Sequence, residues 1–294
     1  MPKKSSIDII IPTYNAQRLL EKNLPIVIKA SPEINKIIIA DDGGTDNAPE
    51  FLKKHFPQVI STRHNKNIGF SKTVNEGVNN SHSDFIVLIN NDVYPLSGYI
   101  EKSLKYFEDP KVFAVNFNEE NSSWPQVSWH SGKFQYIRGE DKTRPHYSAW
   151  PSGGSCIFRR SIWDKLGGLN EIYSPGYWED IDLGWRAWKS GYKVLWSPEA
   201  KVVHDHESTF GLKNKSMMDL VKQRNELLFI WQNFSDSGMI FSHLGFLFTN
   251  CLNHPGYIKV VLVALKEYIS KGKKAKYPLS DQQVFALINT PYEN

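Results

Sequence analysis

Short, continuous runs of apolar residues alternate with amphipathic segments over the first hundred residues of the chain. The runs are rich in β-branched residues and predict strands at residues 7–11, 36–40, 59–62 and 84–89. The segments between them predict helices over residues 16–30, up to Phe56 and over residues 71–78. Pro25 is expected to bend or divide the first helix. Apolar strands that alternate with helices favour a mostly parallel sheet with helices on both faces.

The pattern changes after residue 118 and again near residue 213. Residues 118–152 are polar and aromatic with weak periodicity, which predicts loops and a hairpin over one edge of the sheet. The elements predicted next are strands at 153–160, 192–196 and 201–204 and helices at 161–166 and 179–190. Helical spacing then runs to about residue 271, with a break at Pro255. We expect an α/β domain over residues 1–212, with halves at 1–118 and 119–212, and a helical C-terminal extension over residues 213–294.

Composition narrows the class of protein. With 294 residues and 40% hydrophobic content the chain can bury a full core, and a net charge of +4 is too small to indicate a nucleic-acid-binding face. Cys156 and Cys251 are far apart, which fits a reducing compartment. The N-terminal apolar run stops at Pro12, too soon for a signal peptide, so we expect a cytoplasmic protein. No apolar run approaches the length of a membrane span.

Polar clusters follow three of the predicted strands directly. They are residues 12–15 (PTYN), 41–46 (DDGGTD) and 90–92 (NND). Ligands of open α/β sheets bind outside the carboxyl ends of the strands, so the clusters are expected to share one crevice. Turns are often rich in Asp, Asn and Gly for conformational reasons alone, and Asp46 is suited to cap a helix. Three such clusters at neighbouring strand ends favour a binding site over that alternative.

These clusters stand in the order and spacing of one enzyme family, together with GGSCIFRR at 153–160 and WEDIDLGWRAWKSGY at 178–192. The chain resembles glycosyltransferase family 2, and the resemblance covers residues 6 to about 210. Within that family it is most similar to bacterial rhamnosyl- and galactofuranosyl-type transferases of surface polysaccharides, which often carry NND in place of DxD. The resemblance implies a GT-A fold, with residues 1–212 as the catalytic domain, and a nucleotide-sugar donor.

The resemblance implies that the first two strand ends hold the donor nucleotide. Tyr14 would line the base pocket and Asp42 would accept a hydrogen bond from the pyrimidine ring, supported by Thr13 and Asp41. A carboxylate facing a base N–H discriminates because the wrong base leaves it unpaired. Asn67, in an N-x-G sequence before a helix, is equally suited to a structural role. The predicted donor-binding residues are Pro12, Thr13, Tyr14, Asp41, Asp42, Asn67, Asn90 and Asn91.

The third strand end is the predicted metal site. By resemblance, Asp92 would bind Mg²⁺ or Mn²⁺ that bridges the donor phosphates, and His204 would complete the site, with His206 as the alternative ligand. The metal would neutralise charge on the departing nucleoside diphosphate. Asn90 stands where the family usually has an aspartate, and an amide supplies no charge, so Asn90 is assigned to the ribose or the sugar. The alternative for Asp92 is an exposed turn residue.

Glu179 and Asp180 are the predicted catalytic residues. The resemblance places them against the acceptor, with Asp180 as the general base that takes the acceptor hydroxyl proton. Acidic residues at a helix start also follow from the helix dipole alone. The predicted acceptor-binding residues are Gly153, Gly154, Trp150 and Trp178. The alternatives are a tight turn for the two glycines and a place in the core for the two tryptophans.

The C-terminal extension combines apolar helices with a lysine cluster. Residues 239–252 and 257–268 have broad apolar faces, and six lysines between residues 259 and 276 stand against Glu267 alone. This pattern suits a helix on an anionic membrane surface, and it suits equally a packed helical subdomain or a homodimer interface. Residues 223–225 (QRN) do not satisfy the QxxRW sequence of processive members of the family, which favours the addition of one or a few sugars.

Three functions compete for this sequence. The one we expect is an inverting transfer of a sugar from a UDP- or dTDP-sugar to a saccharide or lipid-linked saccharide, in surface polysaccharide synthesis at the inner membrane surface. A sugar nucleotidyltransferase needs a glycine-rich loop where the chain has PTYNAQR. A nucleotide-sugar-binding module with weak or no turnover is supported by Asn90 alone.

Overall fold

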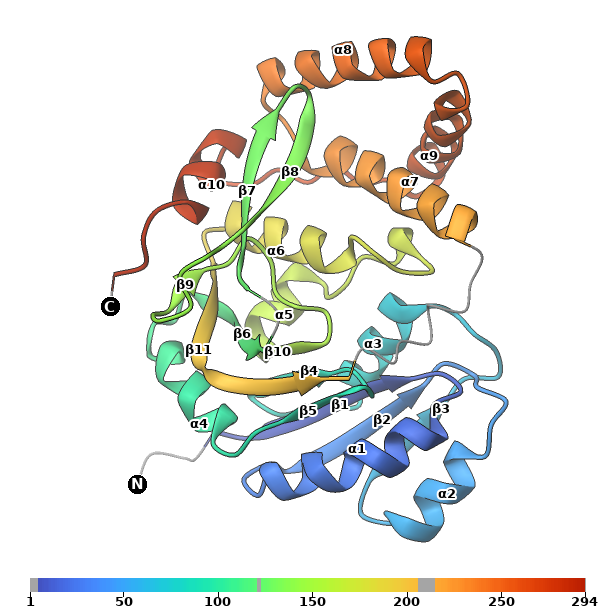
Figure 1. The fold of residues 1–294 in the computed structure, drawn as a ribbon, viewed down its shortest axis with the longest axis vertical. Helices are drawn as coiled ribbons and strands as arrows, with labels where there is room; N and C mark the ends of the chain where they lie inside the picture. Colours follow the sequence, from blue (N-terminus) through green and yellow to red (C-terminus); the bar gives the residue numbers. More distant parts are fainter. Residues whose placement is uncertain (1–4, 121–122, 206–214, 294) are drawn as a thin grey trace.

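A single large sheet with helices on both faces forms the centre of the molecule. The computed structural model describes residues 5–120, 123–205 and 215–293 (Figure 1). The strands are β1 (Ile7–Thr13), β2 (Lys36–Asp41), β3 (Ile60–Arg63), β4 (Phe85–Ile89), β5 (Val93–Pro95), β6 (Val112–Glu119), β7 (Pro125–His130), β8 (Lys133–Arg138), β9 (His146–Tyr147), β10 (Ser155–Arg159) and β11 (Lys193–His204). The helices are α1 (Gln17–Ala30), α2 (Ala48–His55), α3 (Phe70–Asn79), α4 (Tyr99–Leu104), α5 (Arg160–Leu166), α6 (Glu179–Lys189), α7 (Lys215–Asn233), α8 (Ser237–Asn253), α9 (Tyr257–Lys271) and α10 (Asp281–Ile288), with 3-10 turns at Lys105–Glu108 and Glu171–Tyr173.

The strands of the large sheet follow the order β3-β2-β1-β4-β10-β6-β11-β5, and β9 pairs with β11. The first four strands pair in parallel, as do β6 and β11. Strand β10 runs antiparallel between β4 and β6 and joins the two halves of the sheet. Its first residue, Ser155, pairs with Ile89 at the end of β4. The predicted α/β fold with a central sheet, flanking helices and a helical C-terminal region is confirmed.

The apolar strands are buried on both faces, as their continuous apolar runs predict. In β1, Ile9 and Ile11 belong to the core shared with α1 and α2, whereas Ile10 belongs to the core shared with α3. All three side chains are almost fully buried. Because both faces are covered, the carboxyl ends of the strands form the edge at which a ligand can enter.

Helix α1 and strand β11 differ from the predicted elements. Helix α1 is not divided at Pro25, because this residue lies on the exposed side of the helix, where water can serve the carbonyl group of Glu21. The strands expected near 192–196 and at 201–204 are one strand, β11, with an irregularity between Trp196 and Lys201. The hydrophobic pattern does not predict β5, β6 or α4.

The hairpin within residues 118–152 exists, but its predicted place over an edge of the large sheet is wrong. Strands β7 and β8 form a separate sheet that extends to α8 (Figure 1). Phe134 on β8 packs edge-on against Trp185 of α6 and Phe229 of α7. At the tip, Nδ1 of His243 on α8 lies 2.8 Å from the carbonyl oxygen of Gly132. Burial of the hairpin's apolar side chains against α6 and α7 therefore decides its position.

The C-terminal extension is packed on the α/β domain. The helical segment breaks between α7 and α8 as well as at Pro255, and a further helix, α10, follows. Phe234, at the end of α7, stacks on Trp185 of α6 with ring centroids 4.9 Å apart. Lys189 of α6 and Asp281 of α10 form a buried ion pair at 2.6 Å. These contacts join α7 and α10 to the helix that begins with Glu179 and Asp180.

Candidate active site

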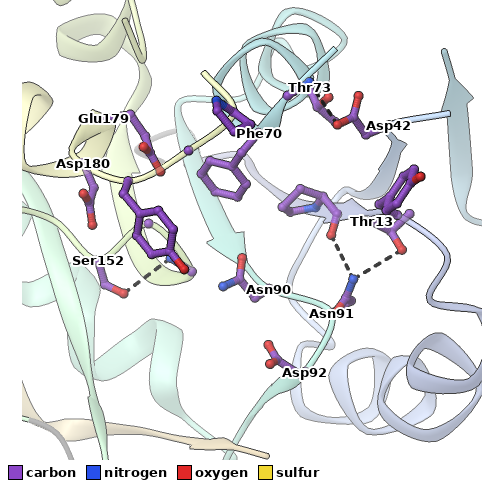
Figure 2. A pocket seen from close by; sticks show the side chains of 18 of the residues that line it. Thr13, Asp42, Phe70, Thr73, Asn90, Asn91, Asp92, Ser152, Glu179 and Asp180 are labelled. Atoms are coloured by element: carbon purple, nitrogen blue, oxygen red, sulfur yellow. Dashed lines mark hydrogen bonds between the residues drawn. The ribbon is translucent and has the colours of Figure 1, made fainter. Parts of the chain in front are cut away.

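A cavity of about 390 Å³ lies at the carboxyl ends of β1 and β4. Residues of all three polar strand ends line it, together with residues of the second half of the chain. Figure 2 shows Glu179 and Asp180 on one side, Thr13 and Asp42 on the other, and Asn90 between them. The lining is Pro12, Thr13, Tyr14, Asp42, Asn67, Gly69, Phe70, Thr73, Asn90, Asn91, Asp92, Glu119, Ser152, Gly153, Gly154, Pro175, Gly176, Tyr177, Glu179, Asp180 and His204.

Asp42 fixes the loop that leads into α3. Its two carboxylate oxygens accept hydrogen bonds from the backbone N–H groups of Ile68, at 2.7 Å, and Gly69, at 3.1 Å. Gly69 has a φ of 95°, and a Cβ atom there would lie 2.6 Å from the hydroxyl oxygen of Ser174. Asp42 therefore holds Asn67 and Phe70 at the cavity wall while it lines the cavity itself.

Asp41 supports the neighbouring turn and does not line the cavity. Its Oδ1 accepts a hydrogen bond from the N–H of Gly44 at 2.9 Å, and its Oδ2 lies 3.5 Å from Nε of Arg63. Burial raises the pKa of this carboxyl group. Asp41 thus fits the alternative in which the DDGGTD cluster stabilises a turn. It would affect a bound ligand only by shaping that turn.

Asn91 ties the end of β4 to the end of β1. Its side-chain amide donates to the carbonyl oxygen of Pro12, at 3.4 Å, and to the hydroxyl oxygen of Thr13, at 3.3 Å (Figure 2). The backbone carbonyl oxygen of Asn91 accepts a hydrogen bond from the side-chain amide of Asn23 on α1 at 2.9 Å. The predicted donor-side residues Pro12, Thr13 and Asn91 therefore also hold two strand ends together.

Asn90 and Gly154 are in close contact. The N–H of Asn90 donates to the carbonyl oxygen of Gly154 at 2.9 Å, and a Cβ atom at Gly154 would lie only 2.1 Å from the Asn90 side-chain nitrogen. A Cβ atom at Gly153 would lie 3.6 Å from the carboxylate of Asp180. Gly154 thus lets the backbone approach the NND cluster closely, whereas a Cβ atom at Gly153 would make only an ordinary contact with Asp180.

Asp92, His204 and Glu119 form a hydrogen-bonded line across the cavity floor. Nε2 of His204 lies 3.2 Å from Oδ2 of Asp92, and its Nδ1 lies 3.3 Å from Oε2 of Glu119. The hydrogen bonds to these two carboxylates raise the pKa of His204 to about 10. Ser155 donates to the other oxygen of Glu119 at 2.5 Å. His206, the alternative ligand, lies outside the described residues.

The Asp92–His204 pair could hold a divalent cation with few protein ligands, provided that the cation replaces the proton that His204 shares with Asp92. Neighbouring ligands of an octahedral ion, each about 2.1 Å from it, lie about 3 Å apart, which matches the 3.2 Å between the two side-chain atoms. Glu119 contacts Nδ1 of His204, the ring nitrogen that does not face Asp92. In carboxylate–histidine–metal arrangements a carboxylate takes the same position. Among the described residues no group of three or more His, Cys, Asp or Glu side chains could hold an ion. Phosphate oxygens and water would therefore complete the coordination.

Glu179 and Asp180 begin α6 and line the cavity from the second half of the chain. Burial, with repulsion from Asp180, raises the pKa of Glu179 to about 8, and burial raises that of Asp180 to about 6. The N–H of Ile181 donates to Oδ1 of Asp180 at 2.8 Å. Within the described part of the chain, Oε2 of Glu179 is buried and has no hydrogen-bond partner. Burial and the closeness of the two carboxyl groups therefore disfavour ionisation of both at once.

The loop before α6 is held by α7. Tyr177 and Trp178 have φ values of 70° and 80°, conformations that cost about 1–3 kcal/mol each for residues other than glycine. The side-chain nitrogen of Asn225, a fully buried residue, lies within hydrogen-bond distance of three carbonyl oxygens of this loop. They belong to Tyr173 at 2.8 Å, Gly176 at 3.0 Å and Tyr177 at 2.8 Å. Arg224 adds a hydrogen bond to the carbonyl oxygen of Ser174 at 2.6 Å.

The two tryptophans proposed for the acceptor side lie against the aromatic core. Trp178 packs on Phe229 with ring centroids 5.3 Å apart, and Trp150 packs on Tyr136 at 5.7 Å. Neither is part of the cavity lining. A place against the core therefore fits Trp150 and Trp178 better than a place in the acceptor site, because the hairpin and α7 supply large apolar partners. Gly153 and Gly154 do line the cavity.

Sequence reasoning missed Glu119, Tyr177 and Asn225. Glu119 ends β6, whose run VFAVNF obeys the same strand-end rule as the three recognised clusters, so a signal for it exists. Asn225 lies inside a helix with no local sign of a special role, and its three backbone partners are about 50 residues away.

The fold and the cavity together define an α/β domain with a candidate ligand site at the carboxyl ends of its strands, and comparisons with known proteins assign its family. The family model described as "Glycosyl transferase family 2" matches residues 8–167, more than half of the chain. The N-acetylglucosaminyl-diphospho-decaprenol L-rhamnosyltransferase of Mycobacterium tuberculosis is 24% identical over 242 residues, which cover 70% of this chain and 78% of that protein. The chain therefore belongs to glycosyl transferase family 2 and is a glycosyltransferase.

Solved structures support the same fold. GalNAc-T7 with UDP, GalNAc and Mn²⁺ superposes with a TM-score of 0.65 at 14% identity, over 81% of this chain and 49% of that chain. A mannosyltransferase from Pyrobaculum calidifontis with GDP-Man and Mn²⁺ superposes with a TM-score of 0.57 at 15% identity, over 92% of this chain and 77% of that chain. The fold is therefore GT-A.

Proposed function

We propose that this glycosyltransferase moves a sugar, with inversion, from a UDP- or dTDP-sugar to a hydroxyl group of a saccharide or lipid-linked saccharide in surface polysaccharide synthesis. The observation that carries the proposal is that Asp180 and the Asp92–His204 pair line one cavity. The first can accept a proton from an acceptor, and the second can face a diphosphate. The name of the mycobacterial relative, which describes rhamnosyl transfer to a diphospho-decaprenol-linked sugar, supports a lipid-linked acceptor.

The donor side is assigned to the strand ends of the first half. Tyr14, Asp42 and Asn67 would contact the nucleotide, and Asn90 the ribose or the sugar, since all four line the cavity. Asp92 and His204 would hold Mg²⁺ or Mn²⁺. When bound, this ion supplies positive charge that stabilises the departing nucleoside diphosphate. Both superposed structures contain Mn²⁺, one with UDP and one with GDP-Man, which supports a metal and a nucleoside diphosphate here.

Asp180 would act as the general base. The acceptor oxygen forms a bond to the anomeric carbon while the bond from that carbon to the phosphate oxygen breaks on the opposite face. The acceptor proton passes to Asp180, and the bonding electrons leave with the nucleoside diphosphate. The raised pKa of Asp180 makes its carboxylate a stronger base than an ordinary aspartate. Glu179, neutral at pH 7, can donate a hydrogen bond to a sugar hydroxyl from the cavity wall.

A screen of UDP-, dTDP- and GDP-sugars by thermal stabilisation, each with and without Mn²⁺, tests the donor assignment. A ligand that binds the native state raises the melting temperature, so UDP- or dTDP-sugars are expected to do so, and more strongly with Mn²⁺. No stabilisation by either class would overturn the assignment. The anomeric configuration of the product, measured by NMR, then tests inversion. Stabilisation that Mn²⁺ does not strengthen, without transfer or hydrolysis, would favour a binding module.

A further inference from the structure

Helices α8 and α9 expose large apolar side chains to solvent. On α8, Phe241 is 74% exposed and Phe248 is 68% exposed; on α9, Leu262 is 60% exposed and Ile269 is 75% exposed. Exposed apolar residues are normal when they are scattered, but contiguous groups mark interaction surfaces. The exposed large apolar side chains of these two helices are Phe241, Leu244, Phe248, Leu252, Ile258, Leu262, Val263, Leu265 and Ile269.

Apart from Val263, the exposed apolar side chains of each helix fall on one stripe. On α8 the positions are 241, 244, 248 and 252, and on α9 they are 258, 262, 265 and 269, the spacing of a single helix face. The opposite face of α8 is fixed in the fold, because His243 contacts Gly132 of the hairpin and accepts a hydrogen bond from Trp231 of α7 at 3.2 Å. The stripe of α8 therefore faces outward at one end of the molecule (Figure 1).

Positive charge accompanies the stripe of α9. Helix α8 contains no Lys, Arg, Asp or Glu. On α9, Lys259 and Lys266 directly follow the stripe residues Ile258 and Leu265, so they lie at the margin of its apolar face. Glu267, the only acidic residue between residues 257 and 276, pairs with Lys271 at 2.7 Å. The remaining lysines of the segment are Lys273, Lys274 and Lys276.

We propose that the apolar stripes of α8 and α9, with the lysines beside the stripe of α9, dock on the surface of an anionic lipid bilayer; together they are named here the α8–α9 face. Apolar side chains enter the boundary between headgroups and acyl chains, and the lysines attract anionic headgroups. A second copy of the chain is the weaker occupant, because it would bring two lysine margins together, and like charges repel across an interface. In the described segments no helix is long and apolar enough to cross a bilayer.

The benefit of this contact rests on the proposed function, because a docked enzyme meets a lipid-linked acceptor in the plane of the membrane. The docking itself can be measured without any sugar. The full-length protein is floated with vesicles of phosphatidylcholine and phosphatidylglycerol, and with vesicles of phosphatidylcholine alone. We expect binding to the anionic vesicles that weakens as salt screens the lysines. A protein that stays unbound on anionic vesicles overturns the proposal.

Substitutions of exposed residues show which part of the protein contacts the vesicle. Phe241→Ser combined with Phe248→Ser removes two exposed rings and is expected to weaken vesicle binding by about tenfold or more. Leu287→Ser, at a residue of α10 that is 42% exposed, is the matched control and should bind as the unaltered protein does. Wild-type binding by the double variant overturns the proposal. A dimer in sedimentation velocity that the double variant dissolves, without vesicle binding, assigns the face to a second copy and also overturns it.

The same preparations separate this proposal from the proposed function. Asp180→Asn should bind vesicles as the unaltered protein does. Stabilisation by Mn²⁺ with UDP or dTDP, measured without vesicles, reports on the catalytic site alone. Nucleotide binding without vesicle binding removes the membrane proposal and leaves the transferase assignment; vesicle binding without nucleotide binding does the reverse.

Discussion

The two walls of the cavity are built in different ways. The wall proposed to bind the donor consists chiefly of strand ends, where side chains that directly follow apolar strands are held by neighbours on adjacent strands, as Asn91 is by Pro12 and Thr13. The wall that carries Asp180 is a loop and a helix start, held in shape by Asn225 of a distant helix. The first wall follows from local sequence, whereas the second depends on the packing of the C-terminal extension.

The largest expected effect on stability follows from loss of the contact between α7 and the loop before α6. Asn225→Ala removes the side-chain amide that faces three carbonyl oxygens of this loop, and removal of one partner of a buried hydrogen bond costs about 1–3 kcal/mol. We expect the free energy of unfolding to fall by about 1–3 kcal/mol. In the fraction that folds, kcat should fall while Mn²⁺-dependent stabilisation by UDP or dTDP persists, because the donor wall is intact.

Urea unfolding and transfer kinetics measure these effects. Asn80→Ala, at an exposed helix end, is the matched control and should change little. Equal loss of nucleotide stabilisation and kcat in Asn225→Ala would show that the two walls are not separable in the way described.

A second prediction concerns the floor between the walls. Glu119→Gln removes the carboxylate on the far ring nitrogen of His204, and changes to such supporting groups typically cost about 10–100-fold in metal affinity. We expect the Mn²⁺ concentration for half-maximal activity to rise by a factor in that range. Glu120→Gln, at the exposed neighbouring residue, is the control. Unchanged Mn²⁺ dependence would remove Glu119 from the site.

A third prediction follows from the raised pKa of Asp180. The base must be ionised, and a carboxyl group is protonated below its pKa, so kcat/KM, which reports the free enzyme, should fall as the pH falls through about 6. Below that pH the decline should approach about tenfold per pH unit. A pH profile of kcat/KM measures it. A profile that stays flat through this range would contradict Asp180 as the titrating base.

The difference between the two walls explains which parts of the site could be predicted from the sequence. Continuous apolar runs fix the strands, and the residues after them, such as Asp42 and Asp92, lie at the cavity because parallel strands end at one edge. Glu119 followed the same rule but was missed with β6. Asn225 could not be found, because its role consists of contacts with a loop far away in sequence. Trp150 and Trp178 show the converse limit: an aromatic residue in a sequence does not reveal whether it faces the core or a sugar.

Asp180→Asn tests the central claim most directly, because the change keeps the shape of the side chain and removes its basicity. Transfer and nucleotide binding are measured on the same preparation, with Asp164→Asn on an exposed part of α5 as the control. We expect kcat to fall by about 10²–10⁴-fold, the usual contribution of a general base, with Mn²⁺-dependent stabilisation by UDP or dTDP unchanged. An Asp180→Asn enzyme with the turnover of the unaltered protein would contradict the account.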